Sequence, residues 1–259
     1  MTDNNMRIWD SFPKTDEKYT KAANVDGNKQ TSLSGNYMVK LATEALGPVG
    51  IGWGYKVLVD RMDETKPCMI KQGSATTQPV FMVIDGKTVW ELNHTIMVEF
   101  WNGTKDNTFE QFGHTKYRYM KADLSKVVVD YEYAKKSLTD AMKKCLSLIG
   151  VCADVFMGEF DDQDYRQVAK LEHDIAKADN AEAEKAKKVE ELKVFITDKV
   201  SAMDMCPNID SMRKVYGLAA AKIDRESALL ELDPKKTKAR LDKKYFEVEA
   251  KLNPKKVAK

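Results

Sequence analysis

The chain has few of the residues from which metal sites and catalytic centres are usually built. It contains three histidines and four cysteines in 259 residues, and no two cysteines form a CxxC pair. This spacing matches neither a zinc motif nor a disulfide framework, so we expect reduced cysteines that pack as small hydrophobic residues, and no metal or other cofactor. No histidine adjoins a nucleophile motif, and we therefore expect that the protein is not an enzyme.

Long hydrophobic runs and a large net charge are also missing. No apolar run reaches 18 residues, and the N-terminus "MTDNNMRIWDSF" lacks a basic start followed by an apolar core. From these absences we expect a cytoplasmic protein that has no membrane partner. The net charge is +2. Binding to a phosphate backbone would therefore need a local patch of cations rather than the charge of the whole chain.

Four glycines are gathered in "GPVGIGWG" (47–54), where they could form a phosphate-binding loop. A P-loop leads from a strand into a helix, and its lysine is followed by serine or threonine. Here the glycines follow a helical pattern and precede a strand pattern, and Lys56 is followed by Val57. We therefore expect a structural turn from helix to strand, in which glycine allows close approach of the backbone.

The pattern of apolar residues predicts an α+β fold for the first two thirds of the chain. Helical spacing occurs over 35–46 and 131–149, and the polar segments 1–35 and 61–79 are expected to be irregular. Strand patterns occupy four stretches, 52–60, 80–84, 88–101 and 107–117. We interpret the last three as an antiparallel β-meander, and we expect the meander to pack on the second helix.

The last third of the chain has a different composition. Alanine, glutamate and lysine dominate 169–195 and predict one long solvated helix, and two further helices are expected over 209–232 and 235–252. We therefore divide the chain into a core at 1–165, with its irregular N-terminal arm, and a charged helical region at 166–259.

Two cation patterns could contact phosphates. On the 131–149 helix, Lys136 and Lys143 lie opposite the apolar stripe at a spacing of roughly 5 to 10 Å, which suits successive phosphates of an extended strand, although a solvated helix face has the same pattern. In "HTKYRYMK" (114–121), Lys116 and Arg118 alternate with tyrosines that could stack on bases or form a cross-strand aromatic ladder.

Two blocks of the sequence resemble the Rad fifty-two superfamily of single-strand annealing proteins. The first is "GNKQTSLSGNYMVKLATEALG" (27–47) and the second is "AKKSLTDAMKKCLSLIGVCADVFMGEFDDQDY" (134–165). They occur in that family's order and spacing, and the similarity covers roughly residues 15–170. The resemblance, together with the chain's size, implies a phage annealing recombinase with a β-β-β-α core.

The resemblance implies a function and a set of DNA contacts. The function is ATP-independent binding of single-stranded DNA and annealing of complementary strands through a duplex intermediate in homologous recombination. Ser147 stands where the family has a further arginine, so another cation must replace it. The residues expected to contact DNA are Lys143, Lys144, Lys29, Lys21, Lys136, Arg118, Lys116 and Lys56.

The resemblance also implies partners. We expect a homo-oligomer, as a ring or a helical filament, and contacts from 166–259 to a phage exonuclease or the host's single-strand binding protein. A different hypothesis is an oligomeric adaptor whose helical tail binds protein partners and whose lysine helix is merely solvated. A metal-dependent nuclease is a third interpretation, and it would cleave DNA with magnesium.

Overall fold

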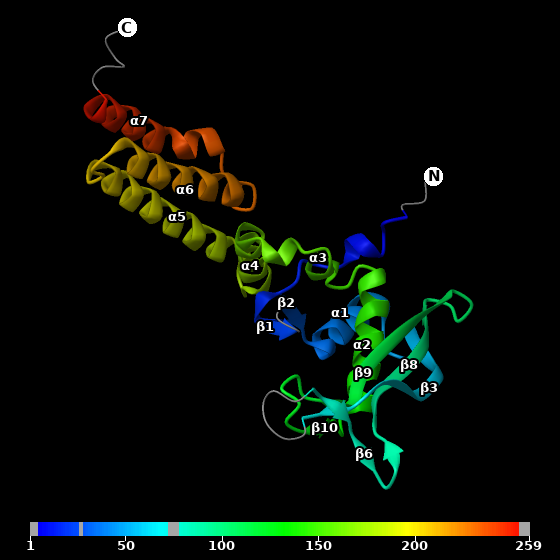
Figure 1. Cartoon of the computed structure of the whole chain (residues 1–259). Helices are drawn as coiled ribbons and strands as arrows, with labels where there is room; N and C mark the ends of the chain where they lie inside the picture. The colour runs from blue at the N-terminus through cyan, green and yellow to red at the C-terminus, as the bar shows by residue number, and fades with distance from the viewer. Residues whose placement is uncertain (1–4, 26–27, 72–77, 254–259) are drawn as a thin grey trace. The chain divides into compact units, whose positions relative to one another are not determined.

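The protein forms two compact units, Met1–Gly158 and Glu159–Lys259, in a computed structural model that describes residues 5–25, 28–71 and 78–253 (Figure 1). Each unit has its own hydrophobic core. The boundary expected at 165/166 falls inside helix α4 (Gln163–Lys177), which belongs to the second unit.

The first unit is built around a four-stranded antiparallel sheet with the order β10-β9-β8-β3. Its strands are β3 (Trp53–Pro67), β8 (Trp90–Asn102), β9 (Thr108–Met120) and β10 (Val127–Val129). Two small hairpins lie between β3 and β8: β4 (Met69–Ile70) with β5 (Val80–Phe81), and β6 (Val83–Ile84) with β7 (Lys87–Thr88). The expected α+β fold with an antiparallel meander is confirmed, but the strand expected at 80–84 was wrongly placed in the meander, because its residues pair in these small hairpins instead.

Helix α2 (Tyr133–Leu148) packs on β8 and β9 of this sheet (Figure 1). Alternate residues of β8, including Ile96, Val98 and Phe100, are buried in the core. The contact is closest at Gly113 of β9, where a Cβ atom would lie 2.0 Å from the carbonyl oxygen of Ser137 in α2. Only glycine lets the helix backbone approach the strand this closely.

The expectation of an irregular N-terminal arm was wrong. The described part of 1–35 contains η1 (Trp9–Ser11), η2 (Glu17–Tyr19) and an antiparallel hairpin of β1 (Thr20–Val25) and β2 (Asn28–Leu33). These strands are rich in polar residues and pair with each other, so they carry little of the alternating apolar pattern that marks a strand. The dipeptide Asp-Gly at 26–27, typical of two-residue hairpin turns, was the missed signal; its conformation lies outside the described residues.

The expected loop at 61–79 was also partly wrong, because β3 continues to Pro67, which pairs with Trp90 of β8. The sequence "RMDETKP" is polar and resembles a loop. In the sheet, β3 pairs only with β8 and most of its side chains are exposed. A strand that is solvated on both faces carries no alternating apolar signal.

The glycine segment forms the expected turn between helix α1 (Gly35–Leu46) and β3. Gly47 and Gly50 have φ values of 96° and 86°, in the region that favours glycine. At Gly52, a Cβ atom would lie 1.8 Å from the carbonyl oxygen of Leu46. The loop therefore follows a helix and enters a strand, the reverse of the P-loop order.

The remaining helices are α3 (Ala153–Phe156) in the first unit and η3 (Glu159–Asp161), α4, α5 (Ala181–Asp204), α6 (Ile209–Ser227) and α7 (Pro234–Leu252) in the second. One long helix was expected over 169–195, and this was wrong, because the stretch contains parts of two helices, α4 and α5. Helix α5 begins after Asn180, whose side chain accepts a hydrogen bond from the Ala183 amide at 3.0 Å. Helices α5, α6 and α7 pack side by side around Met203, Met212 and Ile223 (Figure 1).

The cysteines and the apolar character of the helices bear on the sequence-based expectations. All four cysteines are free, and Cys68, Cys145 and Cys152 are buried, as expected for small hydrophobic residues. In the described parts of the chain, no helix combines the length and the apolar character needed to cross a bilayer.

Candidate functional site

Most lysines of α2 are held by carboxylates of the same unit. Lys135 pairs with Glu132 at 3.0 Å, and Lys136 pairs with Asp130. The hydrogen bond from Lys136 holds the pKa of the Asp130 carboxyl below its usual range. The cation row that the sequence suggested is thus largely neutralised by neighbouring acids.

Lys144 is engaged in the packing of α2 against the sheet. Its ammonium donates to Asp140 Oδ2 at 2.8 Å and to the carbonyl oxygen of Phe112 in β9 at 3.0 Å. The same Asp140 oxygen accepts the backbone N–H of His114 at 3.1 Å. A phosphate at Lys144 would have to compete with two protein acceptors.

Lys143 differs from the other α2 lysines. Its side chain is half-buried, and its ammonium donates to the backbone carbonyl of Leu33 at the end of β2. No ion pair to Lys143 is found among the described residues; burial lowers the pKa of this ammonium, and the charge of Asp140 partly opposes the shift. A partly buried cation without a direct ion-pair partner is stabilised by an incoming anion.

The first turn of α1 lies beside Lys143. A Cβ atom on Gly35 would lie 3.6 Å from Lys143 Cε and 2.8 Å from Thr139 Cγ2. The N-cap residue, Ser34, makes no side-chain cap hydrogen bond, and the first turn carries no acidic residue. The partial positive charge of this helix end therefore adds to the charge of Lys143 and favours an anion at the same place.

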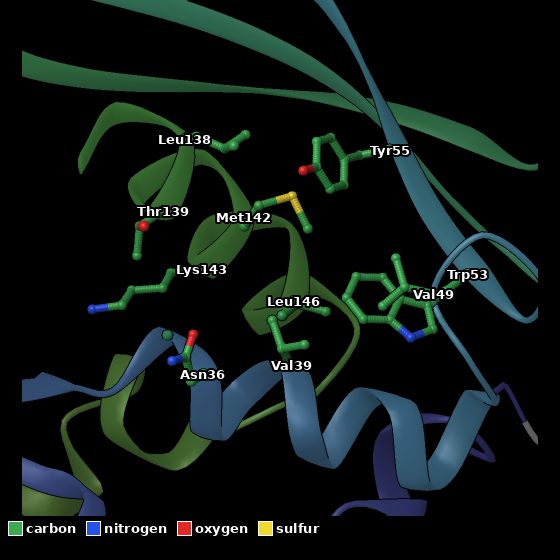
Figure 2. Close-up of a pocket in the computed structure, with 11 residues that line it drawn as sticks. Asn36, Val39, Val49, Trp53, Tyr55, Leu138, Thr139, Met142, Lys143 and Leu146 are labelled. Atoms are coloured by element: carbon green, nitrogen blue, oxygen red, sulfur yellow. The ribbon is translucent and has the colours of Figure 1, made fainter. Parts of the chain in front are cut away.

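A cleft of about 290 Å³ opens between α1, α2 and β3 with Lys143 at one end (Figure 2). Its interior is formed by apolar and aromatic side chains: Val39, Val49, Trp53, Tyr55, Leu138, Met142 and Leu146. Its polar end is formed by Asn36, Thr139 and Lys143, and Figure 2 shows the lysine ammonium pointing away from the apolar interior.

The sequence indicated the cation but missed the cleft. Of its two aromatic residues, Trp53 is a core residue that is 1% exposed, whereas Tyr55 is 39% exposed. The available signal was their spacing, since positions two apart on a strand face the same side. That Val39 of α1 and Met142 of α2 line the same cleft could not be read from local patterns.

The hairpin places Lys21 one pairing position from Leu33, whose carbonyl Lys143 contacts. Lys21 is exposed on β1 and pairs with Ser32, the residue before the Leu33 whose carbonyl Lys143 contacts. Lys29 lies four residues before Leu33 on β2, roughly 13 Å along the strand; its side chain lies outside the described residues. The hairpin thus carries Lys21 and the backbone position of Lys29, and Lys143 of α2 contacts its end.

The other predicted cations do not join this group. Arg118 Nε donates to the carbonyl oxygen of Trp90 at 3.0 Å, and the Lys116 ammonium lies 5.9 Å from the centroid of the Tyr119 ring. Arg118 pairs with Leu92 of β8, whereas Lys56 pairs with Glu99. Leu92 and Glu99 are seven residues apart, roughly 23 Å along the strand, so Arg118 and Lys56 lie far apart on the sheet.

A polar network on the sheet was also not expected from the sequence. The Thr95 hydroxyl donates to Asp63 Oδ2 at 2.6 Å and contacts His114 Nδ1 at 3.1 Å. Because its single proton points to the carboxylate, His114 Nδ1–H is the donor in the second contact. The hydrogen bond from Thr95 and the charge of Arg61 lower the pKa of Asp63. These bonds connect β3, β8 and β9 across the sheet.

Comparisons with known proteins do not assign the chain to a family. No protein-family model matches it, and no curated protein matches it significantly.

Proposed function

We propose that this protein binds single-stranded DNA and anneals complementary strands without nucleotide hydrolysis, as its sequence resemblance implies. The observation that carries the proposal is the Lys143 ammonium, which is half-buried, lacks a carboxylate partner among the described residues, and lies at the mouth of an aromatic cleft. A phosphate at this place would supply a direct ion-pair partner for this ammonium.

The hairpin supports an extended ligand. Lys21 lies next to the Lys143 contact on β1, and Lys29 lies farther along β2. A single strand held at Lys143 could therefore follow the hairpin from one cation to the next. Annealing needs the phosphate repulsion between two strands to be reduced while their bases stay accessible, and a line of cations along many copies of the chain would do this.

A second function is favoured by a different observation. Three of the four lysines of α2 pair with acids of the same unit, as expected for a merely solvated helix, and the helices of the second unit form a core of their own. These features suit an oligomeric adaptor whose helical region binds protein partners.

Binding of a labelled thymidine oligonucleotide at several salt concentrations, without ATP or magnesium, separates the two functions. For an annealing protein we expect the logarithm of the binding constant to fall linearly with the logarithm of the salt concentration. Each phosphate contact should contribute about 0.7 to this slope. Lys143→Ala should reduce that slope by about one contact, whereas Lys135→Ala, which removes a paired lysine of the same helix, should not.

Complementary labelled strands would then report annealing directly. Absence of binding, or binding that does not depend on salt, would support the adaptor. Strand cleavage on addition of magnesium would support a nuclease instead. Equal effects of Lys143→Ala and Lys135→Ala would show that Lys143 is not the phosphate site.

A further inference from the structure

The cleft beside Lys143 has the two properties that a nucleotide requires. One end is cationic and polar, and the rest is apolar with two aromatic side chains, Trp53 and Tyr55 (Figure 2). We propose that the cleft receives one nucleobase of the bound strand while the adjoining phosphate lies at Lys143. This inference rests on the proposed function and adds to it a base-binding site.

The size of the cleft suits one base. Its volume of about 290 Å³ lies at the lower limit of ligand sites, which span roughly 300 to 1,000 Å³. A single planar ring system fits such a space, whereas a dinucleotide does not. Each copy of the chain would therefore hold one base out of the stack and leave the neighbouring bases free for pairing.

The walls offer an apolar surface that does not select among bases. Tyr55 is partly exposed, and Figure 2 shows its ring beside Met142 and Leu138 of α2, with Val39 of α1 opposite. Aromatic and aliphatic walls contact any base through its face, so affinity gained here does not depend on sequence. Annealing of arbitrary complementary strands requires such tolerance.

The polar end distinguishes a base from an apolar side chain of another protein. A hydrophobic anchor would fill the interior but would leave the Lys143 ammonium and the first turn of α1 without an anion. A nucleotide supplies an apolar ring and a negative charge together, in the arrangement that the cleft provides. The charge of the site therefore favours the nucleotide.

The test uses thymidine oligonucleotides that carry one 2-aminopurine, whose fluorescence falls when it stacks, and a terminal dye whose anisotropy reports binding. We expect the full-length protein to quench the 2-aminopurine. Val39→Trp, which fills the cleft, and Tyr55→Ala, which removes one wall, should abolish the quenching. The matched control is Tyr131→Ala, since Tyr131 is 86% exposed and lies outside the cleft.

An abasic oligonucleotide of equal length gives a second measurement that does not depend on folding of a variant. We expect the wild-type protein to bind it at least about tenfold more weakly than the thymidine oligonucleotide at the same salt. If Val39→Trp does not fold, as judged by circular dichroism, this comparison and Tyr55→Ala still decide the question.

The outcomes separate this inference from the proposed function. Normal anisotropy with equal affinity for the abasic and thymidine strands would overturn the base site while leaving DNA binding intact. Absence of any anisotropy change with the wild-type protein would overturn both. A smaller particle size for Val39→Trp with unchanged quenching would show that the cleft receives a second copy of the chain, and would also overturn the base site.

Discussion

The ammonium of Lys143 donates a hydrogen bond to the backbone carbonyl of Leu33, which lies 110 residues earlier in the chain. This contact joins α2 to the end of the β1–β2 hairpin and to the start of α1. The cation at the mouth of the cleft has no ion-pair partner among the described residues.

The first prediction concerns the two adjacent lysines of α2. Replacing both Lys143 and Lys144 with alanine should abolish annealing, and Lys143→Ala alone should account for most of the loss, because Lys144 already donates to Asp140 and Phe112. Annealing of complementary labelled strands measures the effect, and circular dichroism checks the fold. A larger loss for Lys144→Ala than for Lys143→Ala would contradict the assignment.

The second prediction is a pH dependence of DNA binding. Desolvation lowers the pKa of Lys143 below its ordinary value of 10.5, so its charge is lost at a lower pH than that of an exposed lysine. Affinity for single-stranded DNA should therefore fall as the pH rises through this lowered value. Lys143→Arg, which stays charged, should remove the alkaline decrease; an identical pH profile for both proteins would argue against Lys143.

The same shift has a consequence for stability with a defined sign. Between the lowered pKa of Lys143 in the folded state and 10.5, the unfolded chain binds more protons than the folded one. The free energy of unfolding contributed by this group therefore increases as the pH rises through that interval. Denaturant titrations of the wild-type protein and Lys143→Ala should differ in this pH dependence.

The third prediction concerns the attachment of the N-terminal segment. Asp154 accepts two hydrogen bonds from Thr15, one from the backbone N–H at 2.8 Å and one from the hydroxyl at 2.5 Å, and both residues are buried. Asp154→Ala leaves these donors without that acceptor and should lower the free energy of unfolding by about 2 to 3 kcal/mol. Urea denaturation measures it, and the exposed Asp106→Ala should change it by less than about 0.5 kcal/mol.

The fourth prediction compares two glycines. Gly113→Ala should lower the stability of the first unit by about 3 kcal/mol or more, because its Cβ would lie 2.0 Å from Ser137 and force α2 off the sheet. Gly217→Ala, at an exposed position inside α6 with nothing within 4 Å, should stabilise the protein by about 0.5 to 1 kcal/mol. Thermal unfolding of both variants tests the pair; a tolerated Gly113→Ala would mean that α2 and β9 are not in close contact.

Local signals explain which parts of the fold were predictable. The α1–β3 turn follows from its glycines, and α7 begins where Asp233 accepts backbone N–H groups and Pro234 occupies the first turn. The hairpin at 20–33 and the outer half of β3 were missed because polar paired strands carry no alternating apolar pattern.

The sequence by itself determined the α+β class, the helices that flank the antiparallel meander, and the presence of cations on α2, since these follow from residue spacing within each element. Only the tertiary structure decided which of those cations are neutralised, and that Lys143 faces the end of β2 beside a cleft shared by α1, α2 and β3. The reason is physical: spacing determines which residues of a helix share a face, whereas long-range packing determines what that face contacts.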